Sequence, residues 1–296
     1  MLHETQDDVY HHTMKIILIL LTLIPTLVYA QTSVWKISKN NRHLFIGGTI
    51  HVLSKSDYPL PKAYDKAYNQ AARIVLETDL SEANSPDFQS GLLNYFSYPS
   101  GKTLQSALKK QTYRKLQQYC KTANIPMSLL APFRPQLVAL MLTSMELQRL
   151  GVSSAGVDQI FNQMARADGK PVDQLETLEE QLRFLANMGL GQEDELILST
   201  IKENQQLAEI MRFLLGAWRK GDVAALDKEI VQPMRQEFPS IYRDILATRN
   251  NNWMPHISAY LDTAEVEFIL VGALHLVGDD GLLKQLERQG YSISQW

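Results

Sequence analysis

The chain has 296 residues, of which 29 are basic and 32 are acidic, so its formal net charge is −3. This even balance excludes the basic stripe with which a nucleic-acid-binding surface displaces counterions from phosphates. The single cysteine, Cys120, excludes an internal disulfide, so a hydrophobic core must stabilise the fold. Apolar residues make up 45% of the sequence, which is enough to build such a core.

The first thirty residues have the features of a secretory signal. A second possible start, Met14, is followed by Lys15 and an apolar run over 16–29, and Val28-Tyr29-Ala30 resembles a signal-peptidase site. The run is shorter than the roughly 20 apolar residues that a membrane-spanning helix needs. We therefore expect a start at Met14 and cleavage after Ala30.

Cleavage at that point leaves residues 31–296 as the mature protein, with 28 basic and 29 acidic residues. This length is large for one domain and small for two, and no linker or internal repeat divides it. We expect a single periplasmic or secreted domain with no stable membrane anchor after signal cleavage.

Short runs rich in Val, Ile, Leu and Phe predict strands, and helical patterns lie between them. The predicted strands are Val34–Ile37 leading into Leu44–Ile46, Ile74–Leu76, Val172–Leu175, Val266–Val271 and an edge strand over Tyr291–Ser294. The predicted helices are Pro61–Ala72, Leu104–Cys120, Pro135–Leu150, Val157–Ala167, Glu179–Met188, Glu193–Trp218 and Asp279–Gln289. The Pro135–Leu150 helix is apolar almost all round, which predicts burial in the core. The fold class is therefore α/β: a central mixed or mostly parallel sheet with helices packed on it and a large helical middle segment.

Two of the four histidines after residue 30 share one pattern. Gly48-Thr49-Ile50-His51 and Gly272-Ala273-Leu274-His275 each follow an apolar strand. A glycine at a strand end permits a sharp turn or a close approach to a ligand, and open α/β sheets bind ligands at the carboxyl ends of their strands. Paired imidazoles there predict a metal site. The alternative is that each histidine is a hydrogen-bonded core or turn residue.

Carboxylates follow two other predicted strands. Glu77 and Glu176 each stand in a Leu-Glu-Thr triplet directly after a buried strand. An unpaired buried carboxylate is costly, so each must be solvated, paired with a cation or bound to a metal.

A cluster unusually polar for its place inside a late helical stretch spans Thr248-Arg249-Asn250-Asn251-Asn252-Trp253-Met254. Arg249 could stabilise a developing negative charge and Asn250 could orient a ligand or water. Alternatively, Arg249 pairs with Glu77 or Glu176 and holds the loops. For Asp158 we expect a cap or an ion pair near a helix start rather than a catalytic role.

Together these segments resemble the TraB/GumN family. The sequence is similar to the TIKI metalloproteases and more remotely to ChaN and erythromycin-esterase-like proteins. The matching segments are Gly48-Thr49-Ile50-His51, the strand ending in Glu77, Gly156-Val157-Asp158, Gly169-Lys170-Pro171 leading to Leu175-Glu176-Thr177 with Gln181, Arg249-Asn250 with Trp253, and Gly272-Ala273-Leu274-His275 with Gly278 and Gly281.

The resemblance implies an α/β fold and divalent-metal-dependent peptide hydrolysis, with manganese or cobalt as candidate metals. The leading hypothesis is an exported hydrolase whose metal ligands are His51, Glu77 and His275, acting on a peptide or small-molecule substrate. Glu176 would be the general base or a further ligand, Arg249 would stabilise the oxyanion and Asn250 would orient a group. The alternative is a non-catalytic periplasmic binding protein for haem, a metal or a short peptide.

Overall fold

A six-stranded sheet carries the fold in the computed structural model, which describes residues 32–79, 86–98 and 101–296. The strand order is β6-β4-β7-β2-β1-β8, and β6, β4, β7 and β2 run parallel. β1 pairs antiparallel with β2 and with β8, and β3 and β5 form a separate antiparallel pair. The strands are β1 Val34–Lys39, β2 Arg42–Thr49, β3 Val52–Leu53, β4 Arg73–Leu76, β5 Ser154–Ala155, β6 Val172–Gln174, β7 Glu267–Gly272 and β8 Ser292–Gln295. The predicted mixed, mostly parallel sheet is confirmed.

Helices cover both faces of the sheet because alternate side chains of each strand point to opposite faces. On β7, Phe268 and Leu270 belong to one core cluster, together with residues of helices α2 (Lys62–Gln70), α8 (Val157–Ala167) and α11 (Leu207–Lys220). Ile269 and Val271 belong to a second cluster, together with residues of helices α12 (Val223–Leu226), α15 (Thr248–Leu261) and α16 (Leu282–Arg288). All four side chains are fully buried, and each contributes about 1.5–3 kcal/mol to folding. β7 is therefore a firmly packed central strand that holds the residues at its carboxyl end in place.

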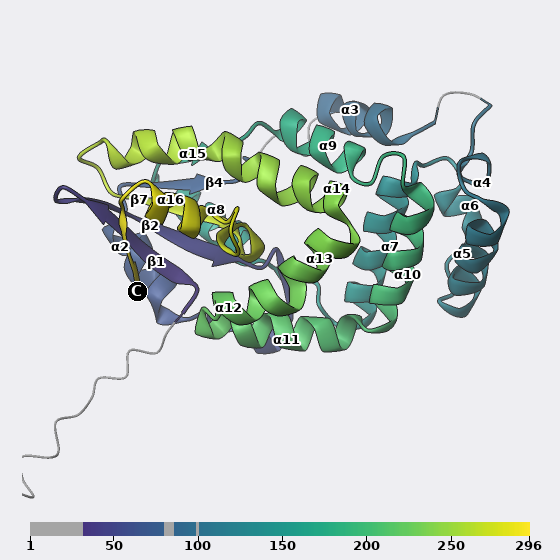
Figure 1. Cartoon of the computed structure of the whole chain (residues 1–296), viewed down its shortest axis with the longest axis horizontal. Helices are drawn as coiled ribbons and strands as arrows, with labels where there is room; N and C mark the ends of the chain where they lie inside the picture. The colour runs from purple at the N-terminus through teal and green to yellow at the C-terminus, as the bar shows by residue number, and fades with distance from the viewer. Residues whose placement is uncertain (1–31, 80–85, 99–100) are drawn as a thin grey trace, which may run out of the picture. The chain divides into compact units, whose positions relative to one another are not determined.

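The remaining chain is mostly helical (Figure 1). The α-helices are α2 Lys62–Gln70, α3 Pro86–Phe96, α4 Leu104–Ala107, α5 Lys110–Thr122, α6 Met127–Leu130, α7 Pro135–Arg149, α8 Val157–Ala167, α9 Leu178–Asn187, α10 Glu193–Gln205, α11 Leu207–Lys220, α12 Val223–Leu226, α13 Gln232–Glu237, α14 Pro239–Tyr242, α15 Thr248–Leu261 and α16 Leu282–Arg288. The short 3-10 and π segments are η1 Lys55–Asp57, η3 Asp227–Val231, η4 Arg243–Ala247 and η5 Ala273–Leu276. Local signals set some boundaries: Thr177 and Glu180 form a capping box at the start of α9, and Gly221 ends α11 in the left-handed conformation.

Two predicted helices are each divided in the structure. The Leu104–Cys120 prediction becomes α4 and α5, because Leu108 and Lys109 are extended and the Lys109 amide donates to the Asp194 carboxylate at 2.9 Å. The Glu193–Trp218 prediction becomes α10 and α11, which meet at Gln206. These interruptions depend on tertiary contacts and on backbone angles that a helical period does not reveal.

The helix predicted to be buried all round, α7, is buried on one face only. Val138, Ala139 and Leu142 lie in the core, whereas Leu140 is exposed. The prediction of complete burial is therefore wrong: another side of α7, which includes Leu140, borders a cavity described below.

Within the described ranges, no helix combines the length and apolar character needed to cross a membrane. The predicted signal peptide, residues 1–30, lies outside the described residues.

Candidate functional site

The four predicted strand-end residues follow four neighbouring parallel strands. Glu176 comes after β6, Glu77 after β4, His275 after β7 and His51 after β2. Parallel strands place their carboxyl ends at one edge of the sheet, so all four residues reach the same edge. β7 lies between β4 and β2, which puts its last residue, Gly272, at the centre of the group.

The two Gly-x-x-His segments do not have the same local structure. Gly48 lies inside β2, packed against η5, and a Cβ there would meet Leu276 Cδ1 at 3.1 Å. Gly272 ends β7, and η5 follows at once and carries His275 into the interior. The His275 side chain is 5% exposed and that of His51 is 59% exposed. The shared pattern therefore gives one interior and one surface imidazole.

A buried guanidinium joins the two glutamates. Arg249 Nη2 lies 2.6 Å from Glu77 Oε2 and 2.6 Å from Glu176 Oε1, and Arg249 Nε lies 3.1 Å from Glu176 Oε1. Arg249 Nη1 faces Ile245 O at 3.3 Å and His275 Nε2 at 3.1 Å. Each of its N–H donors thus faces an acceptor. Of the two sequence-based possibilities for Arg249, ion pairing is present in the structure; oxyanion stabilisation stays a prediction.

His275 is fixed on both ring nitrogens. Its Nδ1 lies 2.7 Å from Asn250 Oδ1, and the Asn250 amide nitrogen donates to His275 O at 3.2 Å and to Asp280 O at 2.8 Å. An amide that donates from its nitrogen accepts at its oxygen, so Nδ1 carries the proton and Nε2 presents a lone pair. The ring also packs on Trp253, with centroids 4.4 Å apart. Burial, opposed by Glu77 and reinforced by Arg249, lowers the pKa of His275 to about 3, so the ring is neutral.

His51 is held from its other side by a carboxylate. Its Nδ1 lies 3.3 Å from Asp158 Oδ1, in the first turn of α8. Gly156 makes this approach possible, because a Cβ there would lie 2.1 Å from His51 O. Desolvation of the ring opposes protonation, but the nearby carboxylates of Asp158 and Glu77 outweigh it and raise the pKa of His51. Because Nδ1 faces Asp158, Nε2 is the nitrogen left for a ligand.

The face of Gly272 is where the candidate ligand atoms meet. A Cβ on Gly272 would lie 3.2 Å from Glu77 Oε1, 3.4 Å from His51 Nε2 and 3.5 Å from His275 Cδ2. The Gly272 amide donates to Glu77 Oε1 at 2.6 Å and so orients that carboxylate. Glycine leaves this space open, and we call it the Gly272 cradle.

The charges around the cradle set the ionisation of the glutamates. Burial alone would raise the pKa of Glu77, but the positive groups facing it and the Gly272 N–H hold that pKa below its usual range. Because His275 is neutral, Arg249 and His51 are the cations responsible. Burial raises the pKa of Glu176 although Arg249 opposes it. Arg249 stays charged because the two carboxylates outweigh its desolvation.

The donor set around the cradle suits a divalent ion. In the described part of the chain, no three His, Cys, Asp or Glu side chains already have a metal-binding arrangement. His51 Nε2 and Glu77 Oε1 nevertheless face one point, while His275 Nε2 lies 3.9 Å from Glu77 Oε1 and shares its lone pair with Arg249. Two imidazoles and a carboxylate are ligands typical of zinc, manganese and cobalt sites.

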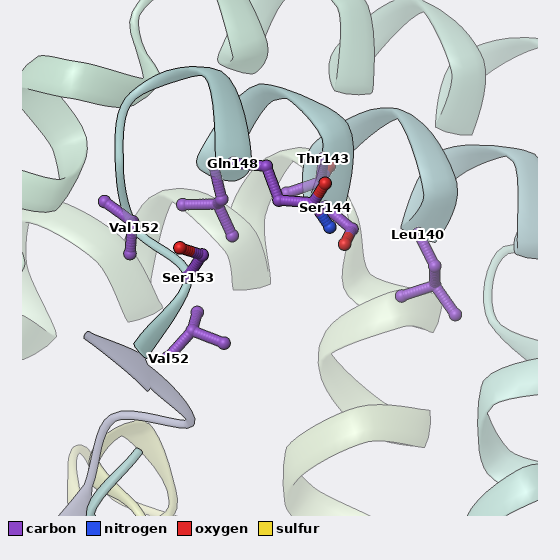
Figure 2. Close-up of a pocket in the computed structure, with 8 residues that line it drawn as sticks. Val52, Leu140, Thr143, Ser144, Gln148, Val152 and Ser153 are labelled. Atoms are coloured by element: carbon purple, nitrogen blue, oxygen red, sulfur yellow. The ribbon is translucent and has the colours of Figure 1, made fainter. Parts of the chain in front are cut away.

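An apolar cavity of about 340 Å³ borders the segment that follows His51 (Figure 2). Val52 of β3 projects into it, opposite α7 and the loop that leads to β5. Its lining residues are Val52, Leu140, Thr143, Ser144, Leu147, Gln148, Val152 and Ser153. Its volume lies at the lower end of the range for small-ligand pockets.

Three contacts in the site were not assigned from the sequence. Asp158 was expected to cap or pair near its helix start, and it faces His51. The Trp253 indole donates to Glu176 Oε2 at 3.0 Å, and Gln181 Nε2 to Glu77 Oε2 at 3.4 Å. All three residues stand in segments that carry the family resemblance, which is the signal that could have identified them.

Comparisons with known proteins cover nearly the whole chain. The model of the TraB/PrgY/gumN family matches residues 33–295. The uncharacterized protein YbaP of Escherichia coli (strain K12) is 26% identical over 250 residues, covering 83% of this chain and 88% of YbaP. YbaP of Shigella flexneri matches with the same identity and coverage. No solved structure matches the chain.

Proposed function

Because this chain belongs to the TraB/PrgY/gumN family and places two imidazoles and a carboxylate around one glycine, we propose that it is an exported divalent-metal-dependent hydrolase of peptides. The observation that carries the proposal is the convergence of Glu77 and His51 donor atoms, with the His275 ring, at the Gly272 cradle. A catalytic metal site typically has three protein ligands of these types and one coordination position open for water or substrate.

In this proposal His51, Glu77 and His275 hold the ion, with manganese or cobalt as candidates. A bound divalent ion would supply Lewis-acid activation of a substrate carbonyl and of a water. Asp158 faces Nδ1 of His51 and leaves Nε2 toward the cradle. Asn250 holds the proton on Nδ1 of His275, so Nε2 has a lone pair, which Arg249 would have to release before this nitrogen could bind the ion. Such outer contacts fix the tautomer and orientation of ligating histidines.

Arg249 and Glu176 support the site in two ways. Their mutual ion pair, together with the Arg249 contact to Glu77, fixes the position of the ligand carboxylate. Glu176 remains the proposed general base: burial raises its pKa, and proton transfer would require Arg249 or Trp253 to release one of its oxygens.

The experiment combines metal analysis with cleavage profiling of the full chain after export. We expect bound divalent metal in the purified protein and cleavage of a mixed peptide library that a chelator abolishes. His51→Ala and His275→Ala should each lower metal content and cleavage at least a hundredfold. His256→Ala is the matched control, because His256 is exposed on α15 outside the site and its loss should change neither.

Two outcomes would contradict the proposal. Full cleavage by the His51→Ala, His275→Ala double variant would show that the imidazoles are not ligands. Retention of metal, haem or a peptide in stoichiometric amounts, with no turnover of any peptide, would instead select the binding-protein alternative.

A further inference from the structure

Two threonine hydroxyls near the cradle are buried and lack partners. Thr49 is 2% exposed and Thr78 is 6% exposed. Neither Oγ1 atom has a hydrogen-bond partner among the described residues. A buried polar group without a partner is costly, and the great majority of such groups are satisfied in native proteins. A ligand bound beside these hydroxyls would supply the acceptors that they lack.

Register places Thr49 directly beside the cradle. Thr49 is the last residue of β2, and its partner on the neighbouring parallel strand β7 is Gly272. Partners in a parallel ladder point to the same face, about 4.8 Å apart. The Thr49 side chain therefore lies beside the Gly272 cradle, the space that a side chain on Gly272 would occupy. Glu77 Oε1 and His51 Nε2 border that space.

Thr78 approaches the cradle from the other neighbour of β7. The β4–β7 ladder ends at the pair Leu76 and Leu270, and Thr78 and Gly272 each lie two residues further on. β4 ends at Leu76, and Thr78 directly follows Glu77, whose Oε1 would lie 3.2 Å from a Cβ on Gly272. The two threonines thus belong to the segments at the carboxyl ends of β2 and β4, the two neighbours of β7.

We propose that Thr49 and Thr78 are positioning residues whose hydroxyls donate hydrogen bonds to an oxygen ligand seated in the Gly272 cradle, a water or a substrate carbonyl oxygen. A hydroxyl is a donor of one hydrogen and suits an oxygen acceptor, whereas it is a poor ligand for a transition metal in its neutral form. This inference rests on the proposed hydrolase function and adds a contact to the reacting oxygen that the histidines and glutamates do not make.

The proposal predicts a combination of effects that a structural role would not give. Replacing threonine by valine keeps the shape and removes an unsatisfied buried hydroxyl, so Thr49→Val and Thr78→Val should fold with equal or higher stability. Each should nevertheless lower kcat/KM about tenfold, the value of one lost hydrogen bond to the reacting oxygen. Thr49→Ser and Thr78→Ser, which keep the hydroxyl, should restore most of the activity.

The test measures thermal unfolding, Co²⁺ affinity by titration and peptide cleavage for each variant of the full chain. Co²⁺ affinity should stay within about threefold of the parent protein, since the metal ligands are unchanged. Thr200→Val is the control: its buried hydroxyl donates to Leu196 O at 2.7 Å on α10, so its loss should lower stability and leave kcat/KM unchanged.

The outcomes separate this inference from the function on which it rests. A parent protein that neither binds Co²⁺ nor cleaves peptides overturns both. An active parent whose Thr49→Val, Thr78→Val double variant keeps full kcat/KM overturns the positioning role alone, as does a loss of activity that serine fails to restore.

Discussion

Removal of the Arg249 guanidinium should strongly destabilise the protein. The side chains of Arg249, Glu77 and Glu176 are 8%, 8% and 4% exposed, so water cannot replace the lost charge. Arg249→Met would leave two buried carboxylates without their common cation. Breaking one buried pair typically costs about 3–5 kcal/mol, and the carboxylates can recover part of that by taking up a proton. We expect a loss of about 4 kcal/mol, close to half the stability of an average domain.

The assay is equilibrium urea unfolding followed by tryptophan fluorescence, which Trp253 beside Arg249 makes sensitive to the site. The control is Arg183→Met. Arg183 pairs with Glu179 at 2.9 Å, but the two side chains are 59% and 66% exposed, so that change should cost less than about 1 kcal/mol. A loss below about 1 kcal/mol for Arg249→Met would refute the view that Arg249 holds the site together.

Three further changes test other parts of the description. Gly272→Ala fills the cradle and should lower Co²⁺ affinity in a titration at least tenfold. The extended backbone at Gly272 accepts alanine, so the free energy of unfolding should change by less than about 1 kcal/mol. Unchanged Co²⁺ affinity would exclude the cradle as the metal position. Glu267→Gln should raise the stability at neutral pH by about 1 kcal/mol, because the Glu267 side chain is buried, burial disfavours its ionised form, and glutamine carries no charge. Burial raises the pKa of Glu267, so the ionised form destabilises the fold above that pKa; the gain should vanish as acid protonates the parent carboxyl, and a gain that persists in acid would count against this cause. Val52→Phe narrows the apolar cavity and should raise KM for peptides with a bulky apolar residue without changing metal content. If the variant and the parent protein show the same KM for bulky and for small peptides, the cavity does not bind the substrate.

The sheet edge was predictable from the sequence because its signals are local. Glu77 and Glu176 directly follow short runs of buried aliphatic residues, His51 and His275 follow such runs after a Gly-x-x spacer, and the carboxyl ends of parallel strands meet. The order of the strands was not predictable, since pairing between β7 and its neighbours joins residues some two hundred positions apart. That order decides which residue lies at the centre, namely Gly272, and the sequence alone did not show that role.

The difference between His51 and His275 shows where pattern reasoning ends. The same spacing predicts the same geometry only if the strands end at the same place, and β2 continues to Thr49 whereas β7 ends at its motif glycine. The buried ring then needs Asn250 and Arg249 as partners, while the surface ring needs only Asp158. These partners come from helices elsewhere in the chain, so their assignment required the fold.

The charges at the site connect the pKa of His51 to the proposed metal. Glu77, Glu176 and Asp158 bring three carboxylates to the edge, and Arg249 brings one permanent cation. His275 is neutral, because a second buried cation beside Arg249 would be costly. The remaining negative charge favours a proton on His51, which raises its pKa, and it favours a divalent ion for the same reason. The two are alternatives at one nitrogen, because Nε2 of His51 must lose its proton before it can ligate.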